Sequence, residues 1–223
     1  RRQRQMCIRD RERTVYRIEP ELFLTNVLGL NIGYFHLSYD SSLLGLTAFE
    51  EVLVNVLTAG DEEESVLLDG NTVLVESDLQ YDEKLRGRKN FTLMHEGSHQ
   101  IFKRLFPTEY GIVRNQTSPV RYYRAGNEKS ARIKDWEEWQ ANTLASAILL
   151  PQELIMQGMY LFSLGERIDC LNRIYCPVVF ERFSAMADFL GSSKKALAIR
   201  MKQLGLVKKE YLDNPYDMIT VYI

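Results

Sequence analysis

The pentapeptide His95-Glu96-Gly97-Ser98-His99 constrains this chain more than any other feature of its sequence. It lies in the segment NFTLMHEGSHQIFKRLF, whose apolar residues recur at helical spacing and which ends at Pro107. Residues four apart share one face of a helix, so both imidazoles can reach a single metal ion. Glu96 then points aside, where its carboxylate can hold a water molecule. The sequence therefore predicts a helix that carries two metal ligands.

A third ligand must come from elsewhere, because a catalytic zinc site has three protein ligands and one open position for water. The remaining histidine, His36, lies far upstream, and the three cysteines lack the spacing of thiolate ligands, which favours a carboxylate. Glu138 and Glu137 both stand at the start of the helical run WEEWQANTLASAILL. We favour Glu138, because small residues on its side of the helix would allow close packing on the first helix: Ala141, Asn142 and Ala145. Glu137 is the alternative, and the acidic residue that is not a ligand would favour the positive end of the helix.

Length and charge limit the other possibilities. With 223 residues, 45% hydrophobic and 26% charged, the chain is expected to form one sizeable core with a small appendage. It has no apolar run long enough for a membrane span and no signal-peptide pattern, so we expect no membrane and a cytoplasmic location. Residues 1–13 carry a net charge of +4, which leaves −6 on the remainder. We expect residues 1–13 to be a non-native or disordered tail and the acidic body to disfavour nucleic acid.

The patterns together predict an α+β fold, with a small antiparallel sheet packed on the two ligand-bearing helices. Pro20 should begin a short helix, and strands are expected within residues 31–39 and 46–57. The turn residues Asp69-Gly70-Asn71 predict a β-hairpin. Its second strand, Thr72 to Glu76, would either pair with an extended substrate at a sheet edge or simply complete the sheet. We assign residues 14–160 to this domain.

Residues 161–223 are predicted to form a helical subdomain. Two helices separated by a Gly-Ser turn, at about residues 178–206, resemble a helix-turn-helix pair, with Ser192 or Ser193 as the cap of the second helix. Direct DNA binding is possible but not favoured, because basic residues are few and the acidic body would repel phosphates. We expect the apolar face of the second helix to pack on the core instead: Leu197, Ile199, Met201 and Leu204. Four further side chains are expected to be buried: Cys170, Cys176, Trp136 and Trp139.

The two motifs together resemble the ImmA/IrrE metallopeptidase family. Its members pair a His-Glu-x-x-His helix with a Glu-x-x-Ala-Asn-type motif, which here reads Glu138-Trp139-Gln140-Ala141-Asn142 and is followed by Leu149-Leu150-Pro151. The resemblance covers about residues 19–155. One departure is Gly97-Ser98, where members often have Leu-Gly or a similar pair, but these positions are not ligands.

This resemblance implies a gluzincin-like fold with one Zn²⁺ held by His95, His99 and Glu138, and Glu96 as the general base. A second group that stabilises the oxyanion is expected from Tyr122, Tyr123 or Arg124. The implied activity is that of a zinc-dependent endopeptidase. Its substrate would be a protein, most simply a helix-turn-helix transcriptional repressor of a mobile element or stress response. The alternative is a transcription regulator or sensor that uses the metallopeptidase fold as a scaffold without proteolytic turnover.

Overall fold

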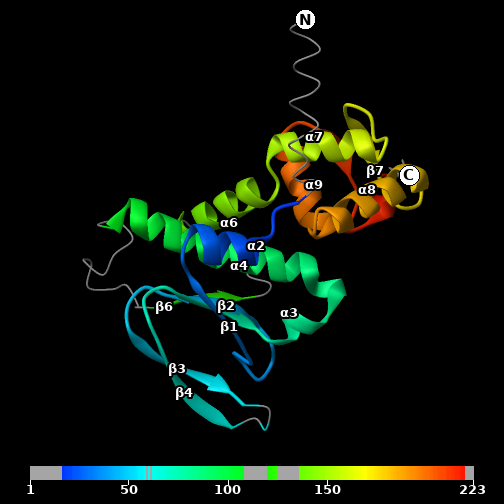
Figure 1. Cartoon of the computed structure of the whole chain (residues 1–223). Coiled ribbons are helices and arrows are strands. Elements are labelled where there is room, and N and C mark those ends of the chain that lie inside the picture. The colour runs from blue at the N-terminus through cyan, green and yellow to red at the C-terminus, as the bar shows by residue number, and fades with distance from the viewer. Residues whose placement is uncertain (1–16, 59, 61, 108–119, 125–135, 219–223) are drawn as a thin grey trace, which may run out of the picture.

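The computed structural model describes residues 17–58, 60, 62–107, 120–124 and 136–218, so the tail expected at residues 1–13 lies outside the described part. The fold is mixed α+β (Figure 1). The first half contains, in order, α2 (Pro20–Leu22), η1 (Phe23–Val27), β1 (Asn31–Phe35), β2 (Leu43–Ala48), β3 (Val52–Leu57), β4 (Glu63–Leu68), β5 (Thr72–Glu76), α3 (Asp78–Tyr81), η2 (Glu83–Leu85) and α4 (Arg86–Leu105). The second half contains β6 (Val120–Arg124), α6 (Trp136–Leu149), α7 (Gln152–Leu161), β7 (Ile168–Leu171), α8 (Pro177–Phe189), α9 (Lys194–Gln203), β8 (Val207–Glu210) and η5 (Pro215–Met218).

The main sheet has four strands in the order β1-β5-β2-β6. β2 pairs antiparallel with β5 and with β6, whereas β1 runs parallel to β5, with Asn31 opposite Thr72. The expectation of an antiparallel sheet is therefore wrong for β1. Of the two roles considered for Thr72 to Glu76, the structure shows the second: β5 lies between two other strands, is buried along its length and completes the sheet.

The hairpin predicted around Asp69-Gly70-Asn71 does not form. β4 pairs with β3 in a separate two-stranded sheet, while β5 enters the main sheet, so the turn is a corner between two sheets. The Asp69 carboxylate stabilises this corner by accepting hydrogen bonds from Asn71 N (2.9 Å) and Thr72 Oγ1 (2.7 Å). Gly70 fits because a Cβ there would lie 2.6 Å from the Phe49 carbonyl oxygen. Asp69, Gly70 and Asn71 do form a turn, but the strands that it connects pair with other strands.

Helix α4 lies across one face of the main sheet and packs lengthwise against α6 (Figure 1). Side chains from alternate positions of the strands fill this interface, among them Val73 and Val75 of β5. The opposite face carries a second apolar cluster that is covered by the β3–β4 hairpin, to which Leu46 and Leu74 contribute. The central strands are therefore buried on both faces, and α4 is held against a rigid support.

The N-terminal helix confirms Pro20 as its first residue but widens into the π-helical turn η1. From this turn Leu24 packs against Gly97 of α4, where an added Cβ would approach Leu24 Cδ1 to 3.0 Å. A glycine inside a helix costs up to about 1 kcal/mol relative to alanine. The close approach of Leu24 explains why a glycine occupies this position between the two histidines.

The C-terminal segment forms the predicted helix pair, α8 and α9, beside α7 and the parallel pair β7–β8. Ser193 caps α9, because its hydroxyl oxygen accepts a hydrogen bond from Ala196 N at 3.1 Å. On α9, Leu197 and Met201 are fully buried, but Ile199 is exposed, contrary to expectation. Both buried residues belong to the same apolar cluster as the α4 residues Leu93 and Met94, so this face of α9 is used in packing.

Two further expectations about burial were wrong. Trp136 and Trp139 are stacked on each other with ring centroids 4.7 Å apart, and both are more than half exposed. Cys170 and Cys176 are only partly buried. Within the described part of the chain, no helix is both long and apolar enough to cross a bilayer.

Candidate metal centre

The centre is built on the middle of α4, where His95, Glu96 and His99 are each at most 1% exposed. One residue later, Gln100 ties the helix to β2: its Nε2 donates to Thr47 Oγ1 at 2.8 Å and to the Ala48 carbonyl at 2.7 Å. These bonds satisfy a buried amide and fix the position of α4 along the strand. The two histidines are therefore presented by a helix that has little freedom to slide.

Three candidate ligand atoms meet between α4 and α6. The Nε2 atoms of His95 and His99 are 3.1 Å apart. The Glu138 carboxylate closes the group, with Oε2 at 3.1 Å from His95 Nε2 and Oε1 at 3.3 Å from His99 Nε2. His95, His99 and Glu138 can therefore hold a metal ion, and the third ligand that sequence reasoning favoured comes to the right place.

Glu137, the alternative ligand, lies beside Glu138 in the first turn of α6. It is absent from the convergent group that His95 and His99 form with Glu138. Successive residues of a helix point about 100° apart, so only one of the two carboxylates can face α4. Of the two carboxylates, Glu138 is the one that the fold brings to His95 and His99.

Asn142 is a residue of this centre whose role the sequence interpretation missed. Its side-chain oxygen lies 3.0 Å from His95 Nδ1. An amide oxygen can only accept, so Nδ1 carries the proton and the lone pair of Nε2 is directed at the other ligand atoms. Ligand histidines in metal sites are usually oriented in this way by a second hydrogen bond. The sequence signal was present, since Asn142 stands four residues after Glu138 on the same helical face.

The arrangement of donors fits a cation. Two imidazole nitrogens and a carboxylate face one another within hydrogen-bonding distance, and Asn142 holds the His95 proton on the far nitrogen. Without a cation or an added proton, these lone pairs would repel each other in a largely buried place. Two histidines and one carboxylate are also a ligand set found in catalytic zinc sites.

Glu96 lies beside this group with both carboxylate oxygens buried and without a hydrogen-bond partner among the described residues. The space next to it exists because β2 has a glycine there: a Cβ on Gly45 would lie 3.0 Å from Glu96 Oε1. A buried carboxyl without a partner is costly, and such groups often belong to functional sites. Gly45 was not identified from the sequence.

The two carboxyl groups differ in their electrostatics. Burial, and after it the negative charge of Glu138, raises the pKa of Glu96 well above its usual value. Burial also acts to raise the pKa of Glu138, but hydrogen bonds and charge interactions with His95 and His99, which these imidazoles offer when they are protonated, outweigh it and hold that pKa well below its ordinary range. Glu138 is therefore suited to be an anionic ligand, and Glu96 to be a group that readily takes up a proton.

The three oxyanion candidates lie on strand β6, but they do not share one environment. The Tyr123 ring packs against the His95 ring at a tilt of 35°, with ring centroids 4.2 Å apart. Tyr122 lies opposite Leu46 in the register; since Leu46 belongs to the cluster on the other face of the sheet, the Tyr122 side chain points away from α4. The side chain of Arg124 lies outside the described atoms. Of the two candidates whose side chains are described, Tyr123 is the one that the fold brings to the centre.

Comparison with known proteins adds no assignment, since no protein-family profile, curated protein or solved structure matches this chain. The centre is therefore characterised by its geometry: three convergent candidate ligands, a buried carboxyl beside them, and strand β6, whose Tyr123 ring lies next to His95.

Proposed function

We propose that the chain is a zinc-dependent endopeptidase of the ImmA/IrrE type with a zincin-like active site. The observation that carries this proposal is the buried Glu96 carboxyl, which stands beside His95, His99 and Glu138 without a described hydrogen-bond partner. A purely structural metal site is closed by four protein ligands and needs no such acid. Three ligands with an adjacent basic group are the requirements for activating a water molecule.

In this proposal, His95, His99 and Glu138 hold the ion. When bound, zinc supplies Lewis acidity that lowers the pKa of a coordinated water and polarises a carbonyl group. Glu96 accepts the proton of the attacking water at its carboxylate and later delivers it to the leaving amine. Its buried position favours both steps, because burial makes the carboxyl a stronger base.

The extended substrate is proposed to bind along β6. Among the described strands, β6 stands at the end of the main sheet and pairs only with β2. Its Tyr123 is adjacent to His95, so a peptide added to this edge would pass the centre. Tyr123 is then the candidate for a contact with the developing oxyanion.

The substrate class is proposed to be a cytoplasmic protein, in the first instance a helix-turn-helix repressor. The described surface around the centre suits a polypeptide, since Trp136 and Trp139 offer exposed aromatic area on the ligand-bearing helix α6. Direct DNA binding by the α8–α9 pair is not favoured, because basic residues are few there and residues 14–223 carry a net charge of −6, which would repel phosphates.

Metal content and turnover test the proposal separately. Glu138→Gln removes the anionic ligand, and Glu137→Gln makes the same change one residue away as a matched control. We expect the wild type and Glu137→Gln to hold one zinc ion at His95, His99 and Glu138, as measured by elemental analysis after dialysis. Glu138→Gln should lose this ion. If Glu138→Gln retains this ion with unchanged affinity, the metal centre is assigned wrongly.

Turnover is tested by co-expression with a candidate repressor encoded beside the gene. The wild type should cut the repressor and Glu96→Gln should leave it intact while still binding zinc, with mass spectrometry locating the cleaved bond. If zinc is bound but both proteins leave every tested partner and an unbiased peptide library uncut, the scaffold function replaces the peptidase.

A further inference from the structure

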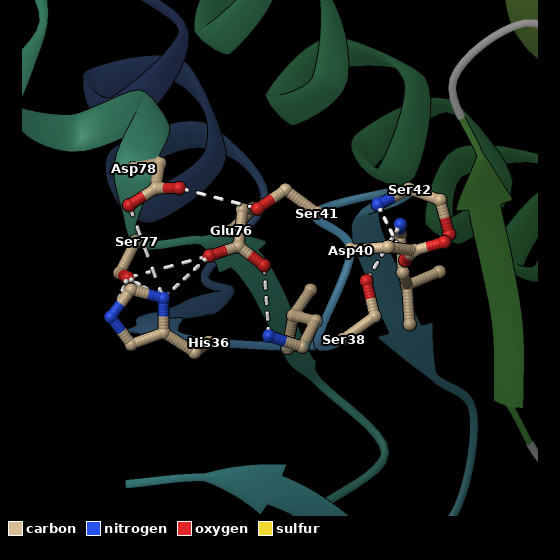
Figure 2. A network of polar contacts seen from close by, with 10 residues as sticks. His36, Ser38, Asp40, Ser41, Ser42, Glu76, Ser77 and Asp78 are labelled. Carbon is tan, nitrogen blue, oxygen red and sulfur yellow. Dashed lines mark hydrogen bonds and ion pairs between the residues drawn. The ribbon is translucent and has the colours of Figure 1, made fainter. Parts of the chain in front are cut away.

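A second group of potential metal ligands lies where β1, β5 and α3 come together, separate from the α4–α6 centre. His36 follows β1, Glu76 ends β5 and Asp78 begins α3. One ligand atom from each of them lies within 4.8 Å of the others. Figure 2 shows the His36 ring facing the Glu76 and Asp78 carboxylates. Three elements of the fold thus bring an imidazole and two carboxylates to one place.

The distances suit coordination of one ion. His36 Nδ1 lies 3.0 Å from Glu76 Oε1 and 4.0 Å from Asp78 Oδ1. Two ligands about 2.1 Å from a tetrahedrally coordinated ion stand about 3.4 Å apart, which lies between these two distances. Asp78 needs a small rotation to close the group, and its side chain is 57% exposed and therefore able to turn.

The charges of this group also favour a cation. Glu76 is only 1% exposed, and its Oε2 accepts a hydrogen bond from Leu37 N at 2.8 Å, which leaves Oε1 directed at the imidazole. In the part of the chain that the structure describes, His36 is the ion-pair partner of both carboxylates, and no Lys or Arg approaches them. When the imidazole is neutral, two negative charges are left together, one of them buried, and a divalent ion would offset both.

The surroundings provide access and support. A surface hollow of about 220 Å³ opens beside His36 and Asp78, and Ser38, Ser41 and Thr58 give it a polar lining. Ser41 Oγ donates to Asp78 Oδ2 at 3.3 Å, an outer hydrogen bond of the kind that orients metal-ligating carboxylates (Figure 2). An ion can enter through this hollow, and water can complete its coordination.

We propose that His36, Glu76 and Asp78 form a second site for a divalent transition-metal ion, with three protein ligands. Bound there, the ion links the ends of the parallel strands β1 and β5 to α3, the helix that precedes the α4 segment. The mixed nitrogen and oxygen ligands are those used by ions such as Zn²⁺. This site does not depend on the proposed peptidase activity, because it shares no ligand with the α4–α6 centre.

The test counts Zn²⁺ bound to the full chain by isothermal titration and elemental analysis. The wild type is expected to bind two equivalents and Glu138→Gln to retain one. Asp78→Asn should lower the Zn²⁺ affinity of the second site, the one that Glu138→Gln retains, at least about 10-fold. A loss of that size is already seen when outer partners of metal ligands are removed. Asp40→Asn is the matched control, since Asp40 lies on the nearby loop, bonds to Ser42 N and is outside the group; it should bind like the wild type.

Circular dichroism establishes that each variant is folded. His36→Gln is a second, independent variant that should also lower the Zn²⁺ affinity of this site. The proposal is overturned if Asp78→Asn and His36→Gln both bind Zn²⁺ like the wild type, or if Glu138→Gln abolishes all binding. Failure of the proposed catalytic centre looks different: Glu138→Gln would then change neither stoichiometry nor affinity, while Asp78→Asn would still lower the binding at the second site.

Discussion

A methyl group added at Gly45 is expected to disrupt the packing of β2 on α4 beside Glu96. The new Cβ would lie 2.6 Å from Thr92 Cγ2, which is 0.8 Å inside the 3.4 Å at which ordinary contacts begin. Thr92 is fully buried and belongs to a helix that Gln100 fixes to the strand, so it cannot turn into solvent to relieve the contact. Forcing a methyl group into such a core costs about 1–3 kcal/mol.

We therefore expect Gly45→Ala to lower the free energy of unfolding by about 1–3 kcal/mol, measured by urea denaturation of the metal-free protein. Thr92→Ser removes the methyl group that collides, so Gly45→Ala with Thr92→Ser should recover most of the loss. The two substitutions should show a coupling energy of about 0.5–3 kcal/mol. Gly60→Ala serves as a control, because the nearest atom to its added Cβ is 3.9 Å away.

The sign of the effect makes this a strict test. In the absence of a collision, alanine in a strand is more favourable than glycine by roughly 0.5–1 kcal/mol, because glycine loses more conformational freedom on folding. The close packing of Gly45 on Thr92 would be refuted by a Gly45→Ala protein that is at least as stable as the wild type and shows no coupling to Thr92→Ser. The position of Glu96 relative to the strand would then have to be revised.

Three further variants probe separate features. Asn142→Ala should weaken zinc binding at the α4–α6 centre by about 10–100-fold while leaving the fold intact, as measured by competition with a chelating dye. Glu21→Gln should cost about 0.2–1 kcal/mol at pH 7, since the hydrogen bond from Tyr34 holds the pKa of Glu21 below its ordinary value of 4.5. That stabilisation is lost as the pH falls through the folded-state pKa, so urea denaturation at pH 3 should show a smaller difference, and an equal loss at both pH values would contradict the assignment. Ser193→Ala should destabilise the protein by about 1 kcal/mol through the loss of a helix cap, whereas Ser192→Ala should have little effect.

The sequence predicted the parts of the molecule that local geometry determines. The spacing of His95 and His99 follows from the pitch of a helix, and Pro20 and Ser193 mark helix starts by their own chemistry. Glu138 required the motif around it as well, since spacing alone left Glu137 open. These features depend on residues close together in the chain.

The features that the sequence interpretation missed depend on distant segments. The parallel pairing of β1 with β5 joins residues about forty positions apart, and the turn residues at Asp69 and Gly70 carry no information about it. The role of Gly45 became visible only when β2 was placed against Thr92 and Glu96. Exposure of Trp136 and Trp139 likewise depends on which neighbours cover α6, and their residue type had indicated the opposite.

Helix α6 carries two dependent parts of the metal centre within one turn. Glu138 is a candidate ligand, and the Asn142 side-chain oxygen faces Nδ1 of His95, where it favours the proton on that nitrogen. A displacement of α6 from α4 would therefore move the Glu138 carboxylate away from the two histidines. The same motion would break the contact between Asn142 and His95, so that the His95 proton would no longer be held on Nδ1. If an ion binds at this centre as proposed, its affinity and the packing of α6 on α4 are thermodynamically linked. A ligand or partner that displaces α6 would weaken ion binding, and a bound ion would stabilise the contact between the two helices.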